Sequence, residues 1–562
     1  MLTKEYKVDL CVVGGGLSGL SCAIAAARNG ITVALVQDRA VLGGNSSEEI
    51  RMWVCGAHGK DNRETGIIEE IQLENFYQNQ GLKYPLWDSV LYEKAKAEPN
   101  LTLLLNCSCF DATMDGTKIH NIRAWQSNAE TFHIVEARYF ADCSGDGILA
   151  PLTNAEFMYG REAKRDFNET IPPDERDNKT MGMSCLFQIR ETDHYVKYTP
   201  PKWAYKFEND DELPFKDHNQ NDNFWWIEVG GEWDCIHDTD RCRDELLKIC
   251  YGVWDHMKNY GDHGVDNWEL EWIGFVPGKR ESRRYLGEYV VTQNDIEQVK
   301  QFDDVVAYGG WSMDDHFPQG FYYKGGEPNI HHPAPSPWAL PLRVMISRNI
   351  DNLTFAGRNI SVTHAALSSS RVMATCATLG QALGTAIAQA VCTVKDIREI
   401  DIKQLQQTLM DDDCYIPFCE REISDITKKA KCNFEIVRNG YDRGEDNCWK
   451  GKTGEVIEYQ LEEDTEIEEI TLVFDSDLNR DYHNMPCSYP LNETKYKLPK
   501  TLIKEYTIEA TDCHNRKYSI NVDDNHQRMV KHKVNWKVNK IKLIPITTHG
   551  DEAFRIFRFD FK

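Results

Sequence analysis

The length, composition and charge of the chain limit what it can be. With 562 residues it is too long for one hydrophobic core, so we expect two or three domains. A formal net charge of -25 at pH 7 would repel nucleic acid and anionic membranes, and we expect neither as a partner. No apolar stretch approaches the roughly 18 residues of a membrane span, and no leader precedes the first apolar run, which predicts a cytoplasmic protein.

The 18 cysteines lie mostly inside apolar segments and form no CxxC pair, which predicts reduced core residues. Cys235, His237, Asp240 and Cys242 stand close together, but their spacing matches no standard zinc pattern. We therefore predict no metal site.

Residues 7–44 predict a strand, a glycine-rich turn, a helix and a second strand. An apolar run ends at Val13, the turn Gly14–Gly19 follows, and an alanine-rich helix leads to the run 32–36. The first glycine permits a tight turn, the second lets the backbone approach a pyrophosphate, and the third lets the helix pack closely on the strand. The backbone N–H groups at the helix start would face the phosphates. The predicted dinucleotide contacts are Gly14, Gly16, Leu17, Ser18 and Gly19.

The second strand ends at Gln37, about where an acidic residue normally binds the ribose hydroxyls. An amide both donates and accepts hydrogen bonds, so Gln37 can still serve. Asp38 is the nearby substitute, and we place Arg39 at the same site.

The segment Leu42–Ser47 follows directly and resembles the second Gly-Gly segment of FAD-dependent oxidoreductases, which runs along the flavin side of the cofactor. A domain that binds only NAD has no need of it. The residues after it, 51–59, would then lie close to the ring, which makes Arg51 and His58 site candidates; the alternative for both is a structural side chain bonded to backbone. The predicted contacts of the loop are Gly43, Gly44, Asn45, Ser46 and Ser47.

Residues 101–143 predict a strand meander, with Asp115-Gly116 as its hairpin turn. It closes in Cys143-Ser144-Gly145, which looks like the turn that follows this meander in flavoproteins with two dinucleotide-binding domains. We expect Cys109, Ser144 and Gly145 near the cofactor.

Residues 164–345 have long polar links and many aromatic residues, which predicts an inserted antiparallel substrate domain. We expect a strand over 224–231, a helix over 241–260 and a strand over 289–291. Trp225 and Trp226 would then point to opposite faces, so at most one contacts a ligand. The cluster Arg280–Arg284 either binds an anionic group or forms a buried salt-bridge knot with Glu281 and Glu288.

Residues 351–393 predict a strand ending in Gly357-Arg358, a segment carrying His364, and a helix that includes Gly380 and Gln381. This resembles the C-terminal FAD signature, in which a helix aims its N-terminus at the pyrimidine end of the flavin. Such a helix stabilises the negative charge of reduced flavin. The alternative is that the small residues of the helix serve only close packing on a sheet.

Together these segments resemble the FAD-dependent oxidoreductase family over residues 1 to about 415. The matching stretches are 14–19, 42–47, 142–147, 160–162, 280–284 and 356–371. The resemblance implies bound FAD and an α/β, Rossmann-like FAD domain of the glutathione-reductase type, formed by residues 1–163 and 346–415. An inserted antiparallel α+β substrate domain, residues 164–345, would interrupt it. The resemblance does not name a substrate.

The tail, residues 430–562, consists of short alternating segments typical of a β-sandwich. We expect strands over 456–461, 467–474, 504–510, 517–522, 540–545 and 554–561. The pattern weakly resembles a discoidin-like domain. Such domains often bind sugars at loop tips, and a purely structural cap on the oxidoreductase is the alternative.

Three hypotheses for function follow. In the first, FAD takes a hydride from a C–H that bears a hydroxyl on a small polar, carbohydrate-like substrate, while a histidine takes the hydroxyl proton. His364 is the first choice for this base, then His58 and His316, with Arg51, Arg283 and Arg343 orienting the substrate. The second is reduction of an activated C=C with an arginine as proton donor and anion clamp. The third is a carbohydrate-binding protein on a non-catalytic scaffold. The electron acceptor stays open.

Overall fold

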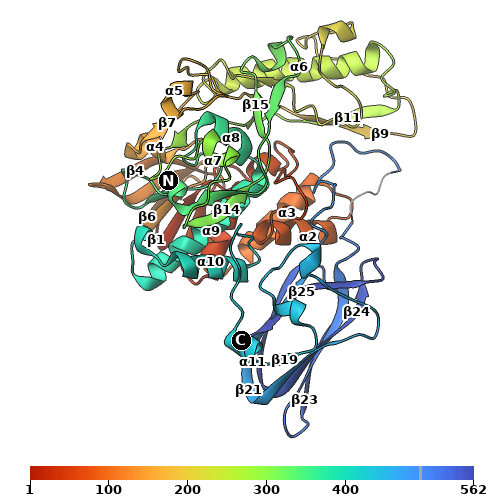
Figure 1. The fold of residues 1–562 in the computed structure, drawn as a ribbon. Coiled ribbons are helices and arrows are strands. Elements are labelled where there is room, and N and C mark those ends of the chain that lie inside the picture. The colour runs from red at the N-terminus through yellow and green to blue at the C-terminus, as the bar shows by residue number, and fades with distance from the viewer. Residues whose placement is uncertain (493–496) are drawn as a thin grey trace.

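The computed structural model describes residues 1–492 and 497–562. Three regions are visible in Figure 1: a central α/β body, a layer above it that contains the long helix α6 (Thr239–Asn259), and a β-rich tail below. Each region has its own hydrophobic core. All 18 cysteines are free, and in the described part of the chain no helix is both long and apolar enough to cross a membrane.

The central body is built on a mostly parallel sheet. Its parallel strands lie in the order β3, β2, β1, β6, β18, and β6 also pairs with an antiparallel meander of β5 and β4. Asp115 pairs with Lys118 around Gly116 at φ +61°, which confirms the predicted hairpin. The strands are β1 (Leu2–Val13), β2 (Val33–Val36), β3 (Leu101–Leu104), β4 (Cys107–Asp115), β5 (Lys118–Gln126), β6 (Thr131–Asp142) and β18 (Leu353–Phe355).

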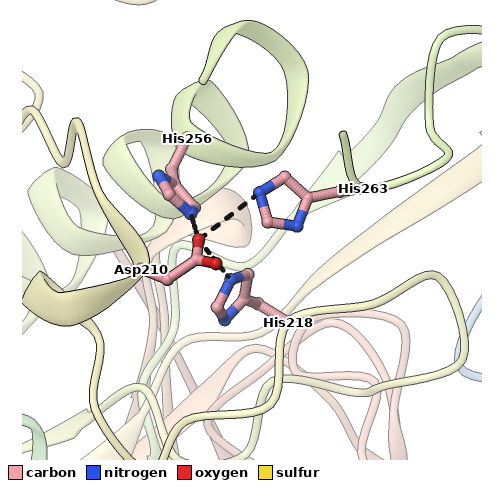
Figure 2. Close-up of side chains that lie close together, drawn as sticks. All are labelled: Asp210, His218, His256 and His263. Carbon is pink, nitrogen blue, oxygen red and sulfur yellow. Dashed lines mark hydrogen bonds and ion pairs between the residues drawn. The ribbon is translucent and has the colours of Figure 1, made fainter. Parts of the chain in front are cut away.

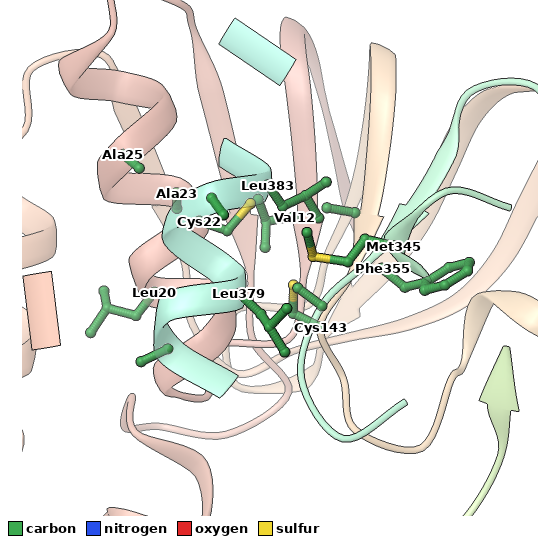
Figure 3. Close-up of a cluster of buried hydrophobic side chains, with 14 of the residues drawn as sticks. Val12, Leu20, Cys22, Ala23, Ala25, Cys143, Met345, Phe355, Leu379 and Leu383 are labelled. Atoms are coloured by element: carbon green, nitrogen blue, oxygen red, sulfur yellow. The ribbon is translucent and has the colours of Figure 1, made fainter. Parts of the chain in front are cut away.

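Helices α1 (Leu17–Arg28) and α9 (Met373–Thr393) pack very closely beside this sheet. A Cβ on Gly380 would come within 2.0 Å of the carbonyl oxygen of Ser18, and one on Gly384 within 2.2 Å of that of Cys22. Figure 3 shows the side chains of α1 and α9 meeting those of β1 and β18 in this core. The other helices of the body are α2 (Ile67–Gln78), α3 (Tyr84–Lys96), α4 (Leu149–Thr153), α8 (His364–Ser370) and α10 (Ile402–Asp411).

The upper layer consists of small antiparallel sheets and α6, which matches the predicted helix over 241–260. Two predicted strands are wrong: only Glu228–Val229 is strand within 224–231, so Trp225 and Trp226 lie in a turn, and in 289–291 only an isolated bridge from Val291 to Val362 forms. The elements are β7 (Phe157–Met158), α5 (Lys164–Phe167), β8 (Met183–Ser184), β9 (Phe187–Glu191), β10 (Glu228–Val229), β11 (Trp268–Ile273), β12 (Gly278–Lys279), β15 (Met313–His316) and β16 (Asn329–His332). In the same stretch of chain, β13 (Arg284–Tyr285) and α7 (Gln293–Glu297) pack into the central core through Tyr285 and Ile296.

Two further strands of the predicted insertion, β14 (Val305–Gly309) and β17 (Trp338–Pro341), pack into the central core instead of the upper one. Part of the stretch 164–345 therefore belongs with the α/β body in packing. The domain limits at 163 and 346 stay a prediction.

The tail is a β-sandwich whose long strands bend through bulges. Two predicted strands, 456–461 and 467–474, form one strand, because β21 runs through the intervening residues with register shifts against β24. The strand order is β20, β25, β21, β24, β22, β23. The elements are α11 (Asp425–Lys429), β19 (Lys431–Cys432), β20 (Trp449–Gly451), β21 (Ile457–Phe474), β22 (Ile503–Thr511), β23 (Lys517–Val522), β24 (Met529–Thr548) and β25 (Phe554–Phe561).

The tail is docked on the body through buried polar contacts. Arg480 forms an ion pair of 2.5 Å with Glu69 of α2, and the side chains of both are almost completely buried. Arg528 pairs with Asp413 at 3.0 Å. Since buried ion pairs require fixed geometry, the sandwich is held to the α/β body, in keeping with a structural cap. Sugar binding by its loops stays a prediction.

Candidate active site

The predicted dinucleotide loop, Gly14–Gly19, is tightly packed at Gly14 and open at Gly16. Gly14 has φ +104°, and a Cβ there would come within 2.5 Å of the backbone of Cys143, so the turn requires glycine. At Gly16, by contrast, the nearest atom to an added Cβ would be 3.9 Å away. The hydroxyl of Ser18, buried at the start of α1, has no hydrogen-bond partner among the described residues. An open glycine face beside an unpartnered hydroxyl and a helix N-terminus fits a pyrophosphate.

Gln37 uses its amide on the loop itself. Its Oε1 accepts a hydrogen bond from the backbone N–H of Gly15 at 2.7 Å, and its Nε2 donates to the carbonyl of Val41 at 3.1 Å. Gln37 therefore joins the two glycine loops. Asp38 is exposed, and Arg39 lies 3.6 Å from Glu49, so Asp38 is the better placed group for a ribose.

The second glycine loop is closed by its own side chains. Gly43 and Gly44 both have positive φ, at +102° and +59°. The hydroxyls of Ser46 and Ser47 donate to the carbonyls of Gly43 and Gly44, at 2.9 and 2.7 Å. Asn45 reaches across to the carbonyl of Lys279 at 3.1 Å, which links the loop to β12.

The predicted flavin end contains several buried polar atoms that lack partners in the described parts of the chain. They surround the turn after β18 and the junction of α8 with α9: Arg358 Nε, Asn359 Oδ1, Ser361 Oγ, Ser370 Oγ, Arg371 Nε and Trp311 Nε1. Buried polar atoms are normally hydrogen-bonded. This set and the unpartnered Ser18 hydroxyl are what a dinucleotide cofactor lying from α1 toward α9 would satisfy.

The remaining predicted cofactor contacts divide into two groups. Arg358 pairs with Asp146 at 2.8 Å, and Gly145 is held close to its guanidinium, so these residues border the flavin end. The second group, Ser144 and Cys109, has its contacts within the protein. The Ser144 hydroxyl donates to Asp142 at 2.6 Å. Cys109 lies on β4, and burial and the nearby Asp142 raise the pKa of its thiol to about 12.

For Gly380 and Gln381 the structure favours the alternative role in packing. Gly380 faces the backbone of Ser18 on α1, as described above. Gln381 Oε1 accepts from the backbone N–H of Ile67 at 2.8 Å, which caps the first turn of α2. Both residues therefore take part in helix contacts, and their role as cofactor contacts stays a prediction.

Two of the predicted histidines lie in one buried, acid-rich cluster where α8 meets β10, β12 and β15. His364 Nδ1 is 3.0 Å from Glu281, and its Nε2 is 3.1 Å from Asp315. His316 Nδ1 is 2.6 Å from Glu228, and its Nε2 is 3.3 Å from Asp314. We call these six residues the acid-rich cluster: Glu228, Glu281, Asp314, Asp315, His316 and His364.

The acid-rich cluster argues against His364 as a base at neutral pH. Burial opposes a charge on the ring, but the carboxylates of Glu281 and Asp315 outweigh it and raise the pKa of His364 to about 10. Burial also opposes charge on His316, whose pKa the carboxylate of Glu228 nevertheless raises. Both ring nitrogens of each histidine are occupied, so neither imidazole has a lone pair free to take a proton.

His58 has the opposite environment. It stacks on Trp311 with ring centroids 4.3 Å apart and remains exposed to solvent. Partial burial and the nearby His331 lower its pKa, so the ring is neutral at pH 7. Its backbone N–H donates to Gly310, and the carbonyl of Cys55 on the same segment accepts from Ala374 at the start of α9. His58 therefore lies on the segment that crosses the N-terminal end of α9.

The arginines predicted to orient a substrate are largely committed. Arg51 donates to Gln188 at 2.7 Å, and its guanidinium lies over the ring of Trp272. Arg343 forms an ion pair of 2.5 Å with Asp304, away from the acid-rich cluster. Arg283 donates to the backbone carbonyl of Asp146 at 3.2 Å.

For Arg280 and Arg284 the structure favours a buried salt-bridge knot over an anion-binding site. Arg280 lies 3.3 Å from Glu228, and Arg284, completely buried, lies 3.0 Å from Glu162 and 3.4 Å from Glu281. Glu288 pairs elsewhere, with Arg398.

Sequence reasoning missed the contribution of the tail to this region. Asn484 accepts from the backbone N–H of Val54 at 2.8 Å, and His483 stacks on Trp53 with centroids 4.4 Å apart. Burial lowers the pKa of His483 to about 4. Because more than 400 residues separate these partners, no local sequence pattern indicates the contacts.

Comparison with known proteins now bears on this site. A model of the family described as FAD dependent oxidoreductase matches residues 9–409. The chain belongs to the FAD-dependent oxidoreductase family. The resemblance stated from sequence is confirmed, and with it an enzyme that uses FAD.

Individual relatives match this family member over short stretches or at low identity. Glycerol-3-phosphate dehydrogenase of Mycobacterium leprae is 38% identical over 72 residues, 13% of this chain and 12% of that protein. Among solved structures, a geranylgeranyl bacteriochlorophyll reductase-like protein of Thermoplasma acidophilum is 11% identical (TM-score 0.31, 73% of this chain, 85% of that one). Glycerol-3-phosphate dehydrogenase of Bacillus halodurans complexed with FAD is 13% identical (TM-score 0.21, 35% and 43%). The chain therefore spans about an eighth of the length of the curated relatives that it matches.

Proposed function

We propose that this FAD-dependent oxidoreductase oxidises a hydroxyl-bearing carbon of a small, uncharged, carbohydrate-like substrate to a ketone, with His58 as the base that takes the hydroxyl proton. The observation that carries the proposal is the difference between the histidines. His58 is neutral and open to solvent, whereas His364 and His316 are held between carboxylates.

The charges near the acid-rich cluster support an uncharged substrate. The guanidinium groups of Arg280, Arg284 and Arg371 are paired with Glu228, Glu162 and Asp314. An anionic substrate would have to compete with these carboxylates for the same donors. A substrate that carries hydroxyl groups can instead donate to carboxylates and accept from guanidinium groups without breaking a pair.

The reaction needs one base and one two-electron acceptor. The hydroxyl proton goes to Nδ1 or Nε2 of His58, whose lowered pKa keeps a lone pair available at neutral pH. Bound FAD would supply the two-electron acceptor for the hydride of the carbon. The residues that would hold it are the glycine loops at Gly14–Gly19 and 42–47, Ser18 and Arg358, and the N-terminus of α9 favours negative charge at that end.

Two other hypotheses are weaker. Reduction of an activated C=C by an arginine clamp needs a guanidinium without a carboxylate partner. Arg280 and Arg284 are paired with carboxylates, so of the clustered arginines this role would fall to Arg283, which donates to the backbone carbonyl of Asp146. Membership of the family removes the motive for a non-catalytic scaffold.

The proposal is tested by an anaerobic absorption spectrum of the flavin-loaded protein before and after a panel of neutral sugars and polyols is added. We expect the flavin bands to bleach with at least one compound. If no sugar or polyol bleaches them, while dithionite-reduced enzyme is reoxidised by an enoate or enone, alcohol oxidation is wrong and C=C reduction replaces it.

The base is tested with His58→Asn, which should retain flavin but slow its reduction by the active compound by about 10²- to 10⁴-fold, the usual contribution of general base catalysis. His237→Asn is the matched control, because His237 is an exposed histidine of the upper layer that pairs with Asp234. Equal rates for the two variants would remove His58 from the role.

A further inference from the structure

Three histidines and one aspartate converge at a second place, in the upper layer (Figure 2). Asp210 begins a short 3-10 helix, His218 lies in the loop after it, His256 is in the last turn of α6, and His263 is in the following connection. One ligand atom from each residue lies within 4.8 Å of the others. We call these four residues the histidine-rich cluster.

The separations in the histidine-rich cluster suit a tetrahedral metal ion. Oδ1 of Asp210 is 2.9 Å from Nε2 of His256, 3.7 Å from Nε2 of His218 and 3.8 Å from Nε2 of His263. Metal–ligand bonds of about 2.0–2.1 Å in a tetrahedral zinc site place the ligand atoms roughly 3.3 Å apart. The three distances lie on both sides of this value. His263 Nε2 also lies 3.1 Å from the carbonyl oxygen of Tyr260, so a metal ion would have to draw this ring away from that contact.

Two of the imidazoles are oriented as zinc ligands usually are. The Nδ1 of His256 is 3.0 Å from the carbonyl oxygen of Phe207, and the Nδ1 of His218 is 2.6 Å from that of Lys216. A carbonyl at Nδ1 selects the tautomer that carries its proton there and leaves the lone pair on Nε2. In both rings Nε2 is the atom that points toward Asp210.

We infer that the histidine-rich cluster is a closed structural zinc site with Asp210, His218, His256 and His263 as its four ligands. Four protein ligands leave no position for substrate or water, which distinguishes a structural site from a catalytic one. The inference replaces the prediction that the chain has no metal site, and it does not depend on the proposed function. Three histidines and a carboxylate favour zinc over calcium or magnesium, which prefer oxygen ligands.

The site would join the loop at 207–218 to the C-terminal end of α6. That loop also holds parts of the upper layer in place: Lys216 Nζ donates to the carbonyl of Tyr323 at 3.0 Å, and the carbonyl of Asp217 accepts from the indole of Trp226 at 2.6 Å. Trp226 lies two residues before Glu228 of the acid-rich cluster. Zinc would therefore order the chain that leads to that cluster.

The residues weighed from sequence do not form this kind of site. Cys235 contacts the hydroxyl of Tyr159, His237 pairs with Asp234, and Asp240 pairs with Arg243. Among the described residues, the histidine-rich cluster is the group of possible metal ligands whose ligand atoms all lie within 4.8 Å of one another.

The experiment is to purify the full-length protein, remove metals with EDTA, add one equivalent of Zn²⁺, dialyse against metal-free buffer and measure zinc by mass spectrometry. We expect about one zinc per chain, and a melting temperature several degrees above that of the EDTA-treated protein, since a ligand that binds only the folded state stabilises it. The double variant His218→Ala/His263→Ala should lose both the zinc and the shift. His237→Ala, which removes an exposed histidine two residues before α6, should keep both.

Cobalt gives a measurement on the wild-type protein that does not depend on whether a variant folds. Co²⁺ added to the metal-free protein should show the intense visible d–d bands of tetrahedral coordination at wavelengths beyond the flavin bands, and one equivalent of Zn²⁺ should abolish them. Wild-type protein that retains less than about 0.2 zinc per chain, shows no zinc-dependent melting shift and gives no tetrahedral cobalt bands would overturn the inference.

Discussion

The acid-rich and histidine-rich clusters contain the same kinds of side chain in opposite proportions. In the acid-rich cluster two histidines lie between four carboxylates, whereas in the histidine-rich cluster three histidines share one carboxylate. The first is buried where α8 meets the upper layer. The second has its carboxylate at the surface, with 74% of the Asp210 side chain exposed.

This difference in proportion decides what the histidines can do. An excess of buried carboxylates keeps His364 protonated, so it acts as a fixed positive charge that holds the body to the upper layer. In the second cluster a single exposed carboxylate faces three imidazole rings, and two of them, His218 and His256, have a backbone carbonyl at Nδ1 that leaves the lone pair on Nε2. Histidine count alone therefore does not identify a base or a ligand; the charge of the surrounding groups does.

The largest expected effect comes from Glu281→Gln. Glu281 is buried and contacts His364, Arg284 and the backbone N–H of Met181. Its loss leaves the buried charges of Arg284 and His364 with one carboxylate each, Glu162 and Asp315, which should lower the free energy of unfolding by up to about 3–5 kcal/mol. Chemical denaturation measures this. The control Glu136→Gln removes an exposed partner of Lys7 and should leave stability unchanged; equal effects would contradict the fixed-charge role.

A smaller effect is expected from the pH dependence of stability. The pKa of His364 is raised from its ordinary value near 6.5 to about 10 in the folded protein. Its contribution to stability is therefore complete below about pH 6.5 and is lost as the pH rises toward 10. At pH 7 His364→Gln should melt below the wild-type protein, and the two melting curves should converge between pH 8 and 10. A difference that stays constant over this range would mean that His364 is not charged at neutral pH.

The smallest effect is expected in the histidine-rich cluster. In metal-free protein, Asp210→Asn removes the carboxylate of the histidine-rich cluster. Because Asp210 is exposed, the free energy of unfolding should change by only about 0–1 kcal/mol. Denaturation in EDTA tests this, and a loss as large as that of Glu281→Gln would erase the contrast between the clusters.

Local sequence predicted the fold of the glycine-rich segment well. The strand, glycine turn and helix of residues 7–44 are contiguous, and close backbone approach gives Gly14 and Gly19 a steric reason that a motif carries. The β-sandwich of the tail also follows from local patterns, although the bulges that join 456–474 into one strand do not. Gln37 departs from the motif, and only the structure shows that its amide holds Gly15.

The catalytic half could not be ranked from sequence. His364 follows the flavin strand directly, which made it the first choice, but Glu281 and Asp315 reach it from positions 83 and 49 residues away. His58, the base that we propose, stacks on Trp311, which is 253 residues further along the chain, and burial and His331 lower its pKa. The charge of a buried histidine is a tertiary property, because it depends on partners that no local pattern identifies.

The most direct test of the account is a pH titration, by NMR, of protein labelled with ¹³C at the Cε1 position of histidine, with signals assigned by His58→Asn and His364→Gln. We expect the His58 signal to be that of a neutral ring at pH 7, and the His364 signal to be that of a protonated ring with no titration between pH 6 and 8. If His364 titrates near pH 6.5, or is neutral at pH 7, the assignment of His58 as the base loses its basis and His364 returns as the first candidate.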